Sequence, residues 1–114
     1  MAPWTGRMKT SLLGRHVHPA EFSTWEGARR YHERHRRSRE TLAHLRATIP
    51  ERGIEEPLLI GVRERDRHVF VYEGHPRAVI ALEMGVPSFP FRWFWDPHLT
   101  QVQAEPFPWH VLGR

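Results

Sequence analysis

A glycine at the boundary between a predicted strand and a predicted helix is the feature that most restricts how this 114-residue chain can fold. Residues 68–72 are apolar and rich in β-branched and aromatic side chains, which is typical of a short strand. Residues 78–84 show the close apolar spacing of a short buried helix, and Gly85 is expected to end it. Gly74 therefore lies where a strand passes directly into a helix.

This junction has the chemistry of an anion site. The first N–H groups of a helix carry partial positive charge, and Arg77 adds a fixed cation beside them. We therefore expect a phosphate to contact Gly74, His75, Arg77 and Ala78. A tight turn with a solvated arginine explains the same residues equally well, so the residues alone leave both interpretations open.

Three segments follow one another in a characteristic order. Residues 49–54 (Ile-Pro-Glu-Arg-Gly-Ile) precede Pro57 and an apolar strand, residues 74–77 (Gly-His-Pro-Arg) precede a short helix, and residues 85–87 (Gly-Val-Pro) precede a second apolar strand. In this order and spacing, residues 42–93 resemble the N-terminal domain of the ParB chromosome- and plasmid-partition proteins, which shares its fold with sulfiredoxin. The resemblance implies an α+β fold, in which helices pack against a small mixed sheet.

The same resemblance implies a nucleotide ligand. The expected cofactor is CTP or ATP/ADP, with or without Mg²⁺. Related domains bring the start of a helix close to the nucleotide, which adds Ser38, Arg39 and Thr41 as candidate contacts by position. His75 would lie near the phosphates as a hydrogen-bond donor or a general acid–base. Glu73 would fix the loop or hold a metal ion with the nucleotide, although a surface or capping role explains it as well.

The chain departs from the sequence patterns of both sulfiredoxin and ParB, and these departures exclude some of the functions known in the two families. Sulfiredoxin needs a cysteine directly after the glycine; His75 stands there and the chain has no cysteine, so it is not a sulfiredoxin. Of the arginine-rich box of ParB, only Gly74, Arg77 and Ala81 match, and residues 96–114 are too short for a DNA-reading helix-turn-helix. We expect a stand-alone ParB-like nucleotide-binding domain. Whether nucleotide hydrolysis or phosphotransfer follows binding stays open, and so does the identity of any catalytic residue.

A second candidate surface is basic. Residues 29–46 contain seven arginines against two glutamates, a formal excess of five positive charges. Such a segment could bind nucleic acid through phosphates, lie beside the Gly74 loop, or form a solvated helix face. The nucleic-acid alternative uses five arginines of this segment: Arg29, Arg30, Arg34, Arg36 and Arg37. An interaction domain that has lost its ligand is a third alternative.

The chain divides into three parts by composition. Residues 1–11 are predicted to form a flexible leader, residues 12–95 the ParB/sulfiredoxin-like domain, and residues 96–114 a tail rich in proline and aromatic residues. In the tail, Phe107 and Trp109 are expected either to fold back on the domain or to contact a protein partner.

Composition restricts the compartment and the partners. The chain has no cysteine and no apolar run of membrane-spanning length, so we expect a cytoplasmic protein without a membrane partner. The net charge of +4 suits an anionic partner such as DNA. His16 and His18 are expected on one face of a short strand, but no third ligand follows at a suitable spacing, so no metal site is predicted.

The remaining expectations concern two helices. The motif Ser23–Glu26 matches a capping box, which predicts a helix start. Leu42, Leu45 and Ile49 recur on one apolar helix face, and Gly53 is expected to end that helix.

The strands carry their own signals. Residues 57–73 are predicted to form a hairpin with Val69 and Val71 on one face, and its second strand is expected at the centre of the sheet. Pro87 and Pro90 predict that the last strand lies at an edge.

Overall fold

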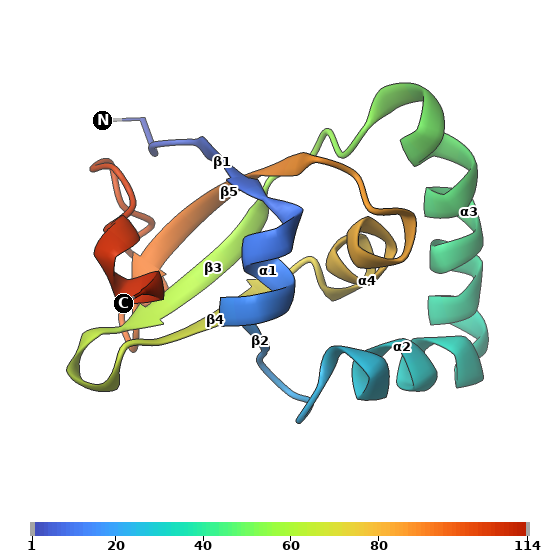
Figure 1. Ribbon diagram of the computed structural model, residues 1–114, viewed down its shortest axis with the longest axis horizontal. Helices are drawn as coiled ribbons and strands as arrows, with labels where there is room; N and C mark the ends of the chain where they lie inside the picture. Colours follow the sequence, from blue (N-terminus) through green and yellow to red (C-terminus); the bar gives the residue numbers. More distant parts are fainter. Residues whose placement is uncertain (1, 114) are drawn as a thin grey trace.

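Five strands form a single mixed sheet in the computed structural model, which describes residues 2–113 (Figure 1). Their order across the sheet is β1-β5-β3-β4-β2. β3 runs parallel to β5 and antiparallel to β4, whereas the short outer strands pair antiparallel (β1 with β5) and parallel (β2 with β4). The strands span Gly6–Lys9 (β1), His18–Pro19 (β2), Leu58–Arg63 (β3), His68–Glu73 (β4) and Ser88–Trp95 (β5).

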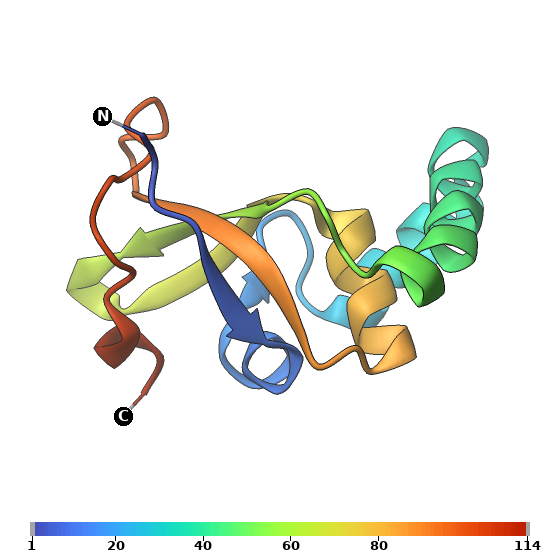
Figure 2. The ribbon, with the colours of Figure 1, turned by 90° about the horizontal axis from the view of Figure 1, so that it is seen from above.

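Four α-helices pack around this sheet. Figure 2 shows α1 on one side of the sheet and α4 between the sheet and the α2–α3 pair, and α4 contacts each of the other three helices. The arrangement confirms the predicted α+β class, with helices packed against a small mixed sheet. The helices span Thr10–His16 (α1), Trp25–Arg34 (α2), Arg36–Arg52 (α3) and His75–Met84 (α4), with single 3-10 turns at Glu64–Asp66 (η1) and Trp109–Leu112 (η2). Across residues 2–113, no helix combines the length and apolar character that crossing a bilayer requires.

The helix that follows the glycine junction is the centre of the core. Four successive residues of α4, Ala78 to Ala81, are buried, because helices cover it on several sides. Gly85 ends α4 in the left-handed conformation (φ 65°), and its N–H donates to the Ala81 carbonyl oxygen. A glycine takes this conformation without steric cost, so the predicted helix end is confirmed.

The hairpin prediction is confirmed. β3 and β4 pair antiparallel, and η1 forms the turn between them. Val69 and Val71 are buried against the helices, whereas Tyr72 on the opposite face is exposed. The predicted central position of the second hairpin strand is not met: β4 is interior, between β3 and the two-residue β2, but the middle strand of the five is β3.

The prediction that the last strand lies at an edge is wrong. β5 lies between β1 and β3. Pairing with β3 begins at Phe91, so Pro90 lies outside the parallel ladder. The N–H group that proline lacks is therefore not needed for a hydrogen bond to β3. The aromatic alternation of β5, with Phe89 and Phe91 buried, persists in spite of the prolines.

The predicted flexible leader is also wrong from Gly6 onward. Residues 6–9 form β1, and the Thr10 N–H donates to the Pro87 carbonyl oxygen. Met8 is fully buried in the core. A single inward apolar residue between polar neighbours does not give an alternation that identifies a strand in the sequence. The strand is stabilised by its pairing with β5 rather than by the β-propensity of its own residues. Met1 lies outside the described residues.

Helix boundaries differ from the predictions by short distances. Residues 10–16 form α1 instead of a strand, so His16 does not share a strand face with His18. The cap of α2 is Thr24, whose side-chain oxygen accepts from the Gly27 N–H, rather than Ser23. The apolar face of α3 and its end at Gly53 are confirmed.

The predicted tail completes the core. Phe107 and Val111 are buried, and the Phe107 ring meets Phe91 edge-on, with 5.2 Å between ring centroids. The indole N–H of Trp93 donates to the Glu105 carbonyl oxygen over 2.8 Å. Of the two predicted outcomes for these aromatic residues, folding back on the domain is therefore the one observed. Arg114 lies outside the described residues.

Candidate functional site

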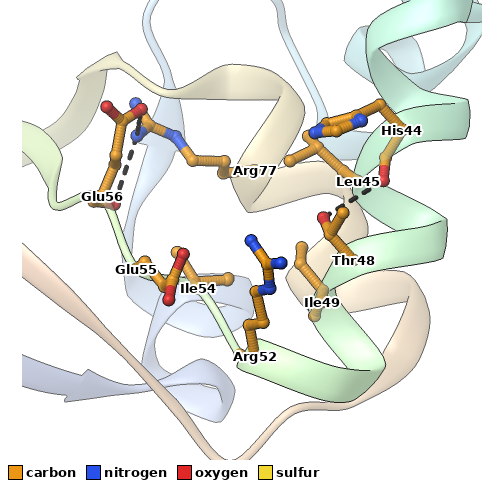
Figure 3. A pocket seen from close by; sticks show the side chains of 10 residues that line it. His44, Leu45, Thr48, Ile49, Arg52, Ile54, Glu55, Glu56 and Arg77 are labelled. Carbon is orange, nitrogen blue, oxygen red and sulfur yellow. Dashed lines mark hydrogen bonds and ion pairs between the residues drawn. The ribbon is translucent and has the colours of Figure 1, made fainter.

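A pocket of about 350 Å³ lies between the C-terminal half of α3 and the segment that leads into β3. Figure 3 shows the Arg52 side chain directed toward the middle of its lining residues, while Arg77 enters from α4 and extends toward Glu56. The pocket is lined by ten residues, namely His44, Leu45, Thr48, Ile49, Arg52, Gly53, Ile54, Glu55, Glu56 and Arg77.

Arg77 is the predicted phosphate ligand that lies in this pocket. One guanidinium nitrogen, Nη1, donates to the carbonyl oxygen and to Oε1 of Glu56, both over 3.2 Å. The Arg77 side chain is only 21% exposed, whereas that of Glu56 is 86% exposed. The arginine is thus held in place by a backbone carbonyl and by a carboxylate that can move away into solvent.

Gly74 allows Arg77 to take this position. Gly74 has a φ of 104°, in the region that side chains rarely adopt. A Cβ atom on it would lie 2.9 Å from Cγ of Leu58 and 3.0 Å from Nη2 of Arg77. The positive φ of the turn requires the glycine, and the guanidinium passes close over its backbone.

The predicted cluster of free amides is smaller than expected. Pro76 has no N–H group, and the Ala78 N–H donates to the Gly74 carbonyl oxygen over 2.9 Å. The Ala78 amide is therefore already used inside the protein and is not a free donor, so a phosphate contact of Ala78 stays a prediction without this support. The amides of His75 and Arg77 remain without an acceptor among residues 2–113.

His75 turns away from Arg77. Its Nε2 accepts a hydrogen bond from the Ala20 N–H over 3.1 Å, and its ring packs near Phe22 and Trp25. An accepting Nε2 requires the neutral tautomer with the proton on Nδ1. Burial lowers the pKa of His75, which favours that neutral form. The histidine fastens the segment before α2 to the start of α4, and it does not line the pocket.

The candidates at the start of α3 do not line the pocket either. Arg39 donates to the Glu33 carbonyl oxygen over 3.4 Å, and the Thr41 hydroxyl donates to the Arg37 carbonyl oxygen. Ser38 lies inside the first turns of α3, and Glu73 is exposed at the end of β4. None of these four residues contributes to the pocket wall.

Three residues of the same helix take their place. His44, Thr48 and Arg52 recur every fourth residue along α3, so they share one face of the helix and line the pocket together. The sequence prediction did not include them, because the arginines at the start of the helix are the stronger charge signal. The polar i, i+4, i+8 spacing beside the apolar face was the available signal.

Four of the seven arginines in the arginine-rich segment pair with glutamates of α2, α3 and α4. Arg29 and Arg30 pair with Glu26, and Arg36 lies 3.4 Å from Glu40. Arg46 joins α3 to α4 through Glu83 and also binds Glu33, which raises its pKa. Arg34, Arg37 and Arg39 are exposed and have no acidic partner among residues 2–113, so nucleic-acid binding by this surface stays a prediction.

In the part of the chain that the structure describes, no three histidine or carboxylate side chains are grouped as metal ligands. Comparisons of the chain with protein-family models, with curated proteins and with solved structures find no match, so the resemblance to ParB and sulfiredoxin stays a prediction.

Proposed function

We propose that the protein binds a nucleoside diphosphate or triphosphate in the pocket between α3 and the start of α4, with Arg77 and Arg52 on the phosphates. The observation that carries the proposal is the position of Arg77, folded over Gly74 at the first turn of α4 and facing a pocket that holds a second arginine. An arginine at a helix N-terminus combines a planar pair of donors with the positive end of the helix dipole.

The other lining residues suit the rest of a nucleotide. His44 and Thr48 offer ring N–H and hydroxyl groups, while Leu45, Ile49 and Ile54 supply an apolar surface for a base or sugar. A volume of about 350 Å³ is within the range of small-molecule pockets, at its lower end.

Two glutamates set a condition on binding. Glu55 and Glu56 balance the formal charges of Arg52 and Arg77, so an anion must compete with Glu56 for the Arg77 guanidinium. A phosphate-bound Mg²⁺ would relieve this competition, since carboxylate oxygens are among the ligands that Mg²⁺ prefers.

Thermal unfolding in the presence of CTP, ATP or ADP, each with and without Mg²⁺, tests the proposal. At a ligand concentration of about 100 Kd, binding to the folded state raises the melting temperature of a domain of this size by on the order of 10 °C. Arg77→Ala should abolish the rise. Arg65→Ala is the matched control, because Arg65 lies in the η1 turn and does not line the pocket.

The proposal is wrong if none of the three nucleotides raises the melting temperature. It is equally wrong if Arg77→Ala retains the full rise, because binding would then occur elsewhere. Arg52→Ala adds a second check from the opposite wall of the pocket and should reduce the rise.

A further inference from the structure

An aromatic cluster covers the side of the sheet that faces away from α1. Pairing places Phe94 of β5 opposite Gly61 of β3, Gly61 opposite Phe70 of β4, and Phe70 opposite His18 of β2. Residues that lie directly opposite each other in a sheet point to the same face. His68 and Tyr72 join this row by alternation along β4. The aromatic face is defined here as His18, His68, Phe70, Tyr72 and Phe94.

Gly61 lets the rings lie across the central strand. A Cβ atom on Gly61 would lie 2.4 Å from Cζ of Phe70 and 2.8 Å from Cζ of Phe94, so no other residue leaves room for both rings. Tyr72 meets Phe94 edge-on at 5.7 Å. His68 is stacked between Phe70 at 5.5 Å and His18 at 5.0 Å. The result is a continuous layer of rings over four strands.

This layer is open to solvent over β2 and β4, whereas Phe94 at its β5 end is buried. The Tyr72 side chain is 42% exposed, and Leu59 and Phe70 are partly exposed beside it. Figure 2 shows α1 and η2 on one side of the sheet and no helix of residues 2–113 over β3, β4 and β5 on the other. No helix of the described chain therefore covers the aromatic face, and its exposed part lies over β2 and β4.

Two arginines border the face without an acidic partner among residues 2–113. Arg92 lies opposite Leu59 in the sheet and is exposed; its side chain bonds Thr5 Oγ1 at 3.1 Å. Arg7 on β1 is also exposed, and within residues 2–113 its side chain donates hydrogen bonds to Ser88 alone. Both guanidinium groups can take up an anion by giving up a contact with a neutral group.

We propose that the aromatic face binds a short stretch of single-stranded nucleic acid, with bases stacked on Tyr72 and Phe70 and phosphates on Arg92 and Arg7. A surface of flat rings next to cations matches a chain in which planar bases alternate with phosphates. A duplex fits poorly, because its base faces are covered by their neighbours. Four strands about 4.8 Å apart give the face a width of roughly 14 Å, enough for two or three nucleotides, so binding is weak and depends on salt.

Fluorescence anisotropy of labelled dT10 and U10, titrated with the full chain at two salt concentrations, tests this site. Tyr72→Ala should weaken binding by about tenfold, because one stacked base is lost, while Tyr72→Phe should keep it. Tyr31→Ala is the matched control, since Tyr31 is a tyrosine of similar exposure (44%) on α2. Arg92→Gln should lower the slope of log affinity against log salt by about one.

Three outcomes would overturn the site. If the Tyr72→Ala variant binds the oligonucleotide as tightly as the parent chain does, bases do not stack on Tyr72. Loss of binding only in a variant with Arg34, Arg37 and Arg39 changed to glutamine would move the contact to the α2–α3 surface. Equal affinity for duplex DNA or for polyglutamate of the same charge would reduce the interaction to unspecific electrostatics. Because the assay uses no free nucleotide and no pocket residue, its result is independent of the proposed function.

Discussion

At the scale of single residues, the proposed nucleotide binding depends on a competition between the ligand and Glu56 for the Arg77 guanidinium. The guanidinium is largely buried, whereas the carboxylate that it contacts is almost fully exposed. An exposed ion pair stabilises a folded protein by about 0.2–1 kcal/mol. The contact with Glu56 is therefore strong enough to orient Arg77 and weak enough for a phosphate to replace the carboxylate. In the proposed function, Glu56 competes with the anion for Arg77.

Glu56→Gln should therefore strengthen nucleotide binding. Removing the competing charge is expected to lower the Kd about two- to fivefold in the absence of Mg²⁺, which matches the upper range for an exposed ion pair. Isothermal titration calorimetry with ATP and CTP measures the change. Glu51→Gln is a suitable control, since Glu51 is exposed near the end of α3 but does not line the pocket. Weaker binding by Glu56→Gln would mean that this carboxylate takes part in holding the ligand.

At the scale of elements, histidines connect α2 to α4. His75 bonds the Ala20 N–H ahead of α2, and His32 of α2 packs near the same Phe22 ring. Neither ring nitrogen of His32 has a hydrogen-bond partner among residues 2–113, and burial lowers its pKa, helped by the nearby charge of His35. The neutral form of His32 is thus the one that fits the fold.

This arrangement predicts a loss of stability in mild acid. In the unfolded chain His32 takes up its proton near a pKa of about 6.5, whereas the folded chain takes it up only at lower pH. The unfolded state therefore binds more protons as the pH falls from about 7 to 5, and the free energy of unfolding decreases. His32→Leu should keep the stability at neutral pH and flatten this decrease. Urea unfolding at several pH values measures it.

His98→Gln serves as the comparison, because the His98 side chain is exposed in the segment after β5. It should leave the pH dependence of unfolding unchanged. An equally steep decrease in His32→Leu and in the parent chain would show that other groups, His75 among them, dominate the acid response.

At the scale of the whole molecule, the two ends of the described chain close one end of the core. Trp4 and Phe107 both meet Phe91 edge-on, at ring-centroid distances of 5.4 and 5.2 Å. The Trp4 N–H donates to the Gln103 carbonyl oxygen, so residues near both termini are joined directly. The segment after β5 is therefore part of the fold and of its stability.

Phe107→Ala should reduce the free energy of unfolding by about 3–5 kcal/mol, because it leaves a cavity against Phe91 and Trp93. Trp109→Ala, in the adjacent η2 turn, should reduce the free energy of unfolding by a clearly smaller amount, since Trp109 is 42% exposed. Guanidinium unfolding monitored by circular dichroism compares the two. Similar losses for both variants would contradict the inward packing of Phe107.

The sequence was sufficient where local chemistry decides the conformation. Gly74 and Gly85 need positive φ, which identified both ends of α4, and the alternation of Val69 and Val71 identified the buried face of the hairpin. The place of Arg77 at the first turn of a helix also follows from the glycine before it, and its role as a phosphate ligand stays a prediction.

Only the tertiary structure decided which side chains meet. The direction of His75 depends on the Ala20 amide, 55 residues earlier in the chain, and β1 exists because β5 is available to pair with it. The pocket face of His44, Thr48 and Arg52 becomes a candidate site only when α3 is placed beside residues 54–56 and Arg77. A local period reports how a segment folds, whereas a site requires contacts between distant segments, and these depend on the packing of the whole core.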